Sequence, residues 1–468
     1  MVKVLDTRMK QPYLKVMKAT EVFTPGTLPK YTYYERPNRN LEEALLHAVD
    51  TPGIIASVSG PSKSGKTVLC ESVIGLGSML LVTGGGVDSE PIFWQRIRSR
   101  LKLPAGTSTS TAAERSHEVG GAAKGGLGFL LKAEGEVSGK IARSTQDQTT
   151  LQFEGISGVD LLERVRAGGQ TLVVDDFHYI GRDLQASLVE QFKEAARAGC
   201  TIVVVSVPHR SDDVIRANPD LRGRLRAVEV SYWTEEELSN IPKLGFPNLN
   251  VKLDEAIVKK FAVESLSSPQ LMQSLCLDLC RAKAIDETLT SLTVVDVRED
   301  DLAHVLKGVA SASSCQTALD ILEKGPRVRG TERKEYSLKD GSSGDVYAVV
   351  LKAISSGKPQ LALSYPEIRD RVALIAEGEP PSGSSIVSTL TQMDEAARNM
   401  RQGDRVLEWD SEKETLNFPD PYFVYFLRWR VVEEVLISLT QSVAGGPGFC
   451  LCGTNKTVGV PASVGLRS

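Results

Sequence analysis

Apolar residues along the chain alternate between short continuous runs and stretches with helical spacing. Five short runs predict buried strands, at residues 54–58, 79–83, 171–174, 201–207 and 227–230. Most gaps between these runs show helical spacing of apolar residues, as in residues 184–198. Alternating strands and helices are typical of a parallel sheet with helices on both faces. The pattern therefore predicts an α/β fold of three layers, in which a parallel sheet lies between two layers of helices.

The chain before the first strand is locally basic and is interrupted by prolines. Residues 1–40 contain eight Lys and Arg against three Asp and Glu, which defines an N-terminal extended basic segment. Pro25 and Pro29 argue against a helix in its second half. Asn40 and Glu43 then predict a capping box at the start of a helix that ends before residue 52.

The second half of the chain is mainly helical in pattern. Residues 233–310 are predicted to be helical throughout, with Thr234 as the first N-cap residue. Residues 311–343 are polar and charged, which indicates a linker. Residues 344–430 show three helical stretches followed by a hairpin, and residues 431–468 indicate a flexible C-terminal tail.

A complete phosphate-binding motif, G-x-x-x-x-G-K-[ST], follows the first predicted strand and opens the next predicted helix. The glycines let backbone N–H groups curl around phosphates, and the helix N-terminus adds its dipole. Lys66 supplies a charge to the β- and γ-phosphates, and Thr67 supplies a hydroxyl to Mg²⁺. The predicted nucleotide-binding residues are Gly60, Pro61, Ser62, Lys63, Ser64, Gly65, Lys66, Thr67 and Val68.

Two carboxylates end the third predicted strand and suit the other half of such a site. A parallel strand delivers its last side chains to the sheet edge where the phosphate loop lies. Asp175 is predicted to hold Mg²⁺ together with Thr67, and Asp176 to orient or deprotonate the attacking water. The alternative is an ordinary acidic turn. His178 is interpreted as a structural residue.

Further catalytic candidates lie at the fourth and fifth strands. Ser206, at the end of the fourth strand, is predicted to sense the γ-phosphate, although a strand-end serine is an equal alternative. Arg222 and Arg224 precede the fifth strand and could stabilise transition-state charge from a neighbouring subunit, or form a solvated edge.

Composition narrows the class of protein. The chain has 468 residues, 41% hydrophobic residues, seven cysteines and a formal net charge of −4. This length predicts two to four domains, and the small net charge gives no overall attraction to nucleic acid or membrane. With no apolar run long enough for a bilayer and no signal-peptide pattern, we expect a reduced cytoplasmic protein.

Residues 105–152, rich in Gly and Ser, predict an insertion that is mobile or partly ordered; it would cover the nucleotide, contact a partner or form a plain loop.

The order of these motifs resembles the AAA+ and STAND branches of P-loop ATPases, over roughly residues 20–310. The Asp175–Asp176 pair is more similar to STAND members. Ser268 and Pro269 resemble the STAND Gly-x-Pro motif of the helical lid, with serine in place of glycine. The resemblance implies ATP as the nucleotide, Mg²⁺ as its metal, and adenine contacts from Tyr33 and Arg36.

The three helices and hairpin of residues 344–430 have the order of a winged helix, and residues 418–423 resemble its end in bacterial and archaeal STAND-like ATPases. Its third helix offers Thr389, Gln392, Arg398 and Arg401 to DNA, but Asp394 and Glu395 lie among them, so the charge is mixed. DNA reading and packing on the ATPase or a partner protein both remain open.

The sequence thus predicts an ATPase that acts as a conformational or oligomerisation switch, with a homo-oligomer and a protein effector or target as expected partners. The alternative is a DNA-binding ATPase resembling replication initiators or transposition regulators. A third interpretation is a nucleotide-stabilised interaction module that never hydrolyses ATP.

Overall fold

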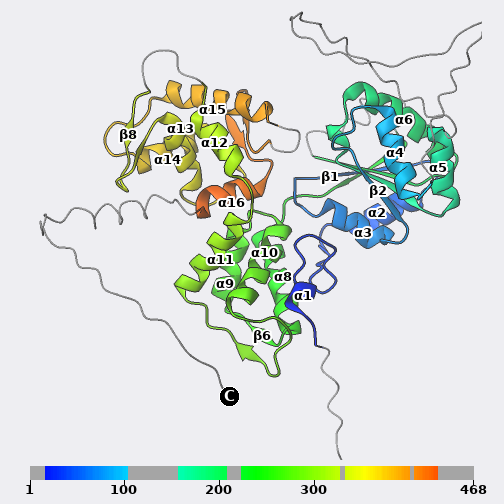
Figure 1. The fold of residues 1–468 in the computed structure, drawn as a ribbon, viewed down its shortest axis with the longest axis horizontal. Helices are drawn as coiled ribbons and strands as arrows, with labels where there is room; N and C mark the ends of the chain where they lie inside the picture. Colours follow the sequence, from blue (N-terminus) through cyan, green and yellow to red (C-terminus); the bar gives the residue numbers. More distant parts are fainter. Residues whose placement is uncertain (1–15, 104–156, 208–222, 327–332, 401–404, 431–468) are drawn as a thin grey trace, which may run out of the picture.

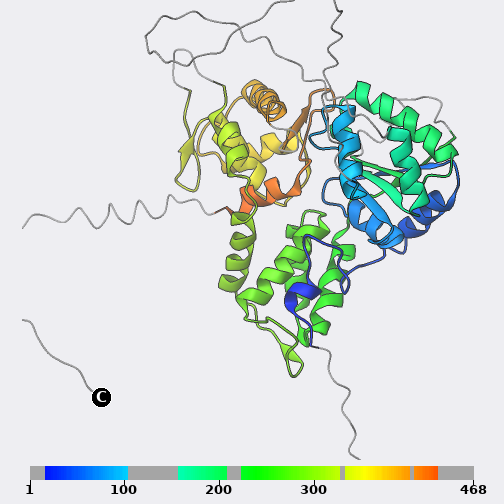
Figure 2. The same cartoon turned by 45° about the vertical axis from the view of Figure 1, so that its right-hand side comes forward.

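The computed structural model describes residues 16–103, 157–207, 223–326, 333–400 and 405–430 (Figure 1). The predicted insertion 105–152, the tail 431–468, Arg222 and Arg401 lie outside the described residues. The described chain forms an α/β unit on one side, with a helical unit and a C-terminal unit stacked on the other, as Figures 1 and 2 both show.

A five-stranded parallel sheet forms the centre of the α/β unit, with strand order β2-β3-β4-β1-β5. Its strands coincide with the five predicted apolar runs to within two residues at each end. They are β1 (Ile55–Ser59), β2 (Met79–Thr83), β3 (Thr171–Asp175), β4 (Ile202–Ser206) and β5 (Leu225–Glu229). The predicted α/β class with a parallel sheet is confirmed.

Helices cover both faces of this sheet, and alternate strand residues face opposite ways. One face packs on α2 (Leu41–Asp50) and α3 (Lys66–Ile74) through Ala56 and Val58 of β1. The other face packs on α4 (Glu90–Arg100), α5 (Gly158–Ala167) and α6 (Arg182–Arg197) through residues such as Leu172 and Val174 of β3. The three-layer arrangement therefore has two separate buried clusters.

The predicted cap of α2 is wrong in its detail. Asn40 adopts a left-handed backbone with φ of 49°, and its side chain makes no capping hydrogen bond, so no capping box with Glu43 forms. Asparagine tolerates this conformation better than most residues. By contrast, Thr234 and Glu237 form the predicted start of the helical unit as a reciprocal capping box.

The helical unit contains α8 (Glu235–Asn248), α9 (Glu255–Glu264), α10 (Pro269–Ala282) and α11 (Glu299–Ser311). A short helix, α1 (Ala19–Val22), packs against α10. Two strand pieces, β6 (Val251–Lys252) and β7 (Thr293–Val294), pair in parallel within this unit. The prediction of helix throughout residues 233–310 is therefore wrong there, because strands of two residues are too short to show an alternating pattern.

The C-terminal unit contains the three predicted helices, α13 (Val346–Ser355), α14 (Tyr365–Ile375) and α15 (Gly383–Arg398), and the predicted hairpin, β11 (Glu408–Asp410) with β12 (Thr415–Asn417). A strand missed by the sequence, β10 (Ala362–Ser364), pairs with β12. Ser364 and Glu367 form the predicted capping box. The chain then ends its described part in α16 (Pro421–Trp429), a helix that the sequence analysis did not predict.

The segment expected to be a linker is partly folded. It contains α12 (Gln316–Lys324) and a small antiparallel pair, β8 (Tyr336–Ser337) with β9 (Ser343–Gly344). Leu319 and Leu322 of α12 are fully buried against the C-terminal unit. The linker prediction fails at residues 316–324 because two buried leucines in a charged stretch are enough to hold a short amphipathic helix.

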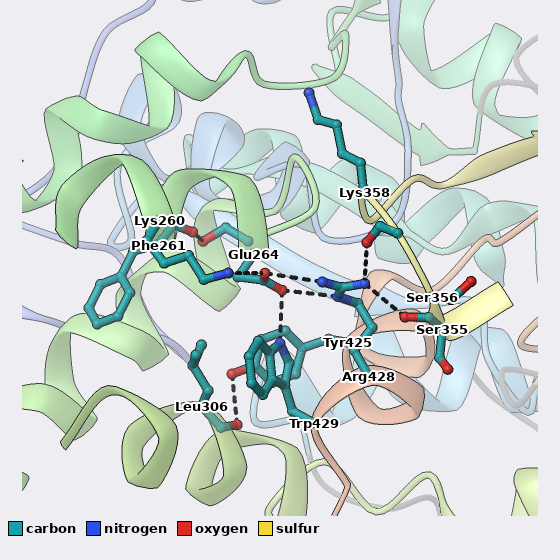
Figure 3. Close-up of polar contacts among 12 residues, drawn as sticks. Lys260, Phe261, Glu264, Leu306, Ser355, Ser356, Lys358, Tyr425, Arg428 and Trp429 are labelled. Atoms are coloured by element: carbon teal, nitrogen blue, oxygen red, sulfur yellow. Dashed lines mark hydrogen bonds and ion pairs between the residues drawn. The ribbon is translucent and has the colours of Figure 1, made fainter. Parts of the chain in front are cut away.

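The helical and C-terminal units share one hydrophobic core, which runs from Leu238 in α8 to Leu427 in α16. A polar cluster reinforces their junction (Figure 3). The buried carboxylate of Glu264 in α9 accepts hydrogen bonds from Lys260 at 3.0 Å, Arg428 at 3.1 Å and Trp429 at 2.8 Å. Figure 3 also shows the Tyr425 hydroxyl, which donates to the Leu306 carbonyl of α11 at 2.8 Å. The two units are thus joined by both apolar and ionic contacts.

Replacing Glu264 with glutamine is expected to lower the free energy of unfolding by about 2 kcal/mol, because it weakens charge-assisted hydrogen bonds to a buried group. Burial alone would raise the pKa of Glu264, but the Arg428 guanidinium, with Trp429 and Lys260, outweighs burial and lowers it. The stabilisation is therefore present above the ordinary carboxyl pKa and is lost as pH falls through the lowered value. Denaturant unfolding of both proteins at pH 7 and at acidic pH measures it.

The matched control is Glu255→Gln, which removes the exposed ion pair of Glu255 with Lys243 at 2.9 Å. An exposed pair contributes little, so this variant should unfold like the unchanged protein. Equal stability of the Glu264→Gln protein at neutral pH would show that the cluster does not hold the units together.

Candidate functional site

The phosphate loop connects β1 to α3 at the carboxyl edge of the sheet. Its backbone has two left-handed residues, Lys63 with φ of 61° and Gly65 with φ of 93°. A Cβ at Gly60 would lie 2.5 Å from the Val230 carbonyl oxygen, so the end of β5 leaves room only for glycine there. These conformations turn the loop sharply enough for its N–H groups to face a common centre.

The start of α3 offers unsatisfied donors to that centre. Gly65 is its N-cap residue, and no side chain caps the helix. Lys66 follows, and its ammonium donates to the carbonyls of Gly60 at 2.9 Å and Pro61 at 2.7 Å. Burial lowers the pKa of Lys66, against the opposing charges of Asp175 and Asp176. A buried cation beside a helix N-terminus is a suitable partner for a polyphosphate.

The predicted metal ligands lie together. The Thr67 hydroxyl donates to Oδ2 of Asp175 at 2.7 Å, and Oδ1 of Asp175 accepts the backbone N–H of Asp176 at 2.9 Å. Oxygen donors of this kind are the ligands that Mg²⁺ prefers. The pair therefore fits a magnesium ion that is shared with phosphate oxygens. Within the described ranges, no group of three or more His, Cys, Asp or Glu side chains forms another metal site.

Asp176 lies beside this pair in an unusual conformation. Its φ of 53° places it in the left-handed region, which directs the backbone into the short 3₁₀ turn Phe177–Tyr179. Burial and the neighbouring charge of Asp175 raise the pKa of its carboxyl, while Lys66 and Lys63 act in the opposite direction. Non-glycine residues with this strain are concentrated at functional sites.

These groups line one cavity of about 1180 Å³. Its volume is above the usual range for small-molecule sites, which leaves ample room for a nucleotide. The three units and the N-terminal segment all contribute to its wall. The α/β unit supplies the phosphate loop, Asp175 and Asp176; the N-terminal segment supplies residues from Thr24 to Arg36; the helical unit supplies Trp233, Pro269 and Gln273; and the C-terminal unit supplies Arg398, Arg405 and Asp420 among others.

The two predicted adenine contacts, Tyr33 and Arg36, both line this cavity, and each is hydrogen-bonded to other parts of the protein. The Tyr33 hydroxyl donates to Glu42 at 2.6 Å. Arg36 is buried, and its terminal nitrogens donate to the Ser231 carbonyl at 3.0 Å and to Glu237 at 2.9 Å. Pro269 lies 4.0 Å from the Cβ position of Gly65, so the lid residue does approach the phosphate loop. Arg36 thus joins the N-terminal segment to the helical unit.

The remaining candidates lie outside the cavity wall. Ser206 is buried at the end of β4, its carbonyl accepts the Gly60 N–H at 3.3 Å, and its hydroxyl has no hydrogen-bond partner within the described part of the chain. Arg224 lies at the amino edge of the sheet, where its carbonyl accepts the Ile55 N–H at 2.9 Å. The phosphate loop is at the opposite edge, so Arg224 can contact nucleotide only from another subunit.

Sequence reasoning missed several residues of the wall. Trp233 donates its indole N–H to the Ser64 carbonyl at 2.9 Å. Arg398, Arg405 and Asp420 reach the cavity from a part of the chain more than 300 residues after the phosphate loop. A tryptophan between the fifth strand and the N-cap of α8 is a signal that could have been noticed, whereas nothing in the sequence places the C-terminal residues here.

Among the residues proposed to read DNA, Thr389 and Gln392 are engaged within the protein, Arg398 is exposed and pairs with Asp394, and Arg401 lies outside the described residues. Thr389 is buried in α15. Gln392 accepts a hydrogen bond from Tyr347, and Asp394 pairs with Arg398 at 2.5 Å and with Arg405 at 2.9 Å. The hairpin that follows is mainly acidic, with exposed Glu412 and Glu414 around one lysine. In the described part of this face the charge is mixed, because the exposed Arg398 and Lys413 lie beside acidic side chains.

Comparison with known proteins gives only distant structural similarities. No family model matches the chain, and no curated protein matches it. Among solved structures, Cdc6p from Pyrobaculum aerophilum is 14% identical with a TM-score of 0.38, over 91% of this chain and 99% of that one. A Walker-type ATPase of Pyrococcus abyssi is 14% identical with a TM-score of 0.43, over 85% and 96%.

The Aeropyrum pernix ORC2 protein, solved as ADPNP–ADP complexes, is 12% identical with a TM-score of 0.42, over 91% of this chain and 98% of that one. Similarities at this level assign no role to any residue. In the described part of the chain, no helix has the length and apolarity needed to cross a membrane.

Proposed function

We propose that this protein is a magnesium-dependent ATPase that works as a nucleotide-controlled switch, of the general AAA+ and STAND kind. The observation that carries the proposal is the 2.7 Å contact between Thr67 and Asp175 beside the phosphate loop, in a cavity that also holds Lys66 and Asp176. Two oxygen ligands, one buried cation and a second carboxylate are the parts that phosphoryl transfer to water requires.

Each residue of this group then has a chemical role. The loop N–H groups and Lys66 bind the phosphates, and Thr67 with Asp175 hold Mg²⁺, which neutralises charge on the phosphate oxygens when bound. Asp176 orients the attacking water and accepts its proton. Ser206, and Arg222 or Arg224 from a second subunit, remain predicted contacts to the transferred phosphate.

The position of the cavity supports the switch. Its wall comes from the α/β unit, the helical unit and the C-terminal unit together. A ligand that binds where units meet changes their relative positions whenever it binds one arrangement better than another. We therefore propose that ATP and its hydrolysis product favour different arrangements, and that a second copy of this chain or an effector protein senses the difference. The engagement of Thr389 and Gln392 within the protein favours this function over base reading by α15.

The Asp176→Asn variant is expected to bind ATP with unchanged affinity and to hydrolyse it at least about 10²-fold more slowly, because the amide cannot accept the proton. The trapped ATP state should also assemble. Light-scattering mass, measured without nucleotide, with ATP, and with ATP on the variant, should rise with ATP and stay high in the variant.

Asp183→Asn is the matched control, since Asp183 is an exposed carboxylate in the first turn of α6. It should hydrolyse ATP at the normal rate. Equal steady-state rates for the unchanged protein and Asp176→Asn would indicate a binding module without turnover. If the light-scattering mass were the same under all three conditions, the oligomeric switch would be contradicted. Any conformational change caused by ATP would then occur within a single chain.

A further inference from the structure

One hydrogen bond links the helical unit directly to the phosphate loop. Trp233, the residue before the N-cap of α8, donates its indole N–H to the Ser64 carbonyl oxygen at 2.9 Å. Ser64 is itself buried, and both residues line the large cavity. The contact spans 169 residues of sequence, so it is a tertiary contact between two units that share the proposed nucleotide site.

Because a peptide unit is planar, this contact at the Ser64 carbonyl also orients the N–H of Gly65. In a trans peptide unit, the C=O of one residue and the N–H of the next lie in one plane and point in opposite directions. If the Ser64 carbonyl is held toward Trp233, the Gly65 N–H is directed away from Trp233. Gly65 has φ of 93° and is the N-cap residue of α3, and because glycine has more backbone freedom than any other residue, its orientation depends on contacts such as this one.

The indole itself is held firmly. The Arg36 guanidinium stacks over the ring at 4.9 Å from its centre. That guanidinium donates to the carbonyls of Ser231 at 3.0 Å and Tyr232 at 2.9 Å, and pairs with Glu237 at 2.9 Å. The backbone just before Trp233 and the helix just after it are therefore both tied to the residue that covers its ring.

We propose that Trp233 is a positioning residue of the phosphate loop: by holding the Ser64 carbonyl, it directs the Gly65 N–H to the phosphates of the bound nucleotide. This inference rests on the proposed function. The same contact couples the units, because any movement of the start of α8 turns the Ser64–Gly65 peptide and so changes the affinity of the loop for phosphate.

The test compares two variants that lack the indole N–H. Trp233→Phe keeps an aromatic ring over which Arg36 can stack. Substitution of Trp233 by benzothienylalanine, which has sulfur in place of the indole N–H, keeps the full shape and so protects against a folding defect. Trp94→Phe is the matched control, because it removes an indole N–H that donates to Glu90 at 2.9 Å, away from the cavity.

Affinities for ATP, ADP and adenosine are measured by calorimetry on each full-length protein. Both Trp233 variants should bind ATP and ADP about three- to tenfold more weakly, the range expected for loss of one hydrogen bond, and should bind adenosine unchanged. Trp94→Phe should bind all three normally. This pattern separates a phosphate-positioning role from a general structural role, which would weaken adenosine binding equally.

Two results would overturn the inference. The first is normal ATP affinity in the benzothienylalanine protein while the unchanged protein binds ATP, which leaves the proposed function intact. The second is an equal loss of affinity for adenosine and ATP, which would place Trp233 in the base or ribose site. Failure of the unchanged protein to bind ATP would instead refute the proposed function, and this role with it.

Discussion

The Lys66→Ala variant is expected to lose ATP hydrolysis by about 10²–10³-fold while its fold remains intact, because preorganised charge at transferring phosphate contributes that much. Lys66 reaches back across the loop to the carbonyls of Gly60 and Pro61, so its ammonium lies inside the turn that would hold the phosphates. Because burial lowers the pKa of Lys66, removal of the charge should not destabilise the protein. Steady-state hydrolysis and thermal unfolding measure the two effects.

The matched control is Lys243→Ala, which also removes one positive charge but from an exposed side chain of α8. It should hydrolyse ATP at the unchanged rate, which excludes an effect of net charge. Normal hydrolysis by the Lys66→Ala protein would show that the phosphate loop is not the site of turnover.

The Asp175→Asn variant is expected to need much more Mg²⁺ and, at a fixed physiological concentration, to hydrolyse ATP at least about 10²-fold more slowly. Asparagine can still accept the Thr67 hydrogen bond that Asp175 accepts at 2.7 Å, so the fold should survive. What it lacks is the negative charge that attracts the cation. A magnesium titration of ATP hydrolysis separates weak metal binding from a slow chemical step.

Asp160→Asn serves as its control. Asp160 is an exposed carboxylate that caps α5 through Ser157, at 2.9 Å from that hydroxyl. Its replacement should leave the magnesium dependence unchanged. If Asp175→Asn and the unchanged protein required the same magnesium concentration, the metal would have to bind elsewhere.

Most of the α/β unit could be predicted from sequence because its signals are local. Buried parallel strands appear as continuous apolar runs, as in β3 and β4, whereas the edge strand β5 is mostly exposed and contains Arg226 and Glu229. The phosphate loop and Asp175 belong to the same local pattern, since each follows directly on a strand. The capping boxes at Thr234 and Ser364 are equally local, and both form.

The features that sequence reasoning missed depend on contacts between distant segments. Helix α12 is stabilised by burial of Leu319 and Leu322 in another unit, and the pairs β6–β7 and β8–β9 are too short for a pattern. The cavity residues Arg405 and Asp420 come close to the phosphate loop only through the packing of whole units. Asn40 failed as a cap because its backbone is left-handed, which composition does not reveal.

The ionic junction at Glu264 connects the C-terminal unit to the phosphate loop by way of the helical unit. It joins α9 of the helical unit to α16 of the C-terminal unit over a continuous apolar core, and the helical unit in turn contacts the phosphate loop through Trp233. By thermodynamic linkage, a molecule that binds the C-terminal unit and alters nucleotide affinity has its own affinity altered by nucleotide by the same factor. A binding partner of the C-terminal unit is thus expected to act as a nucleotide regulator without approaching the nucleotide.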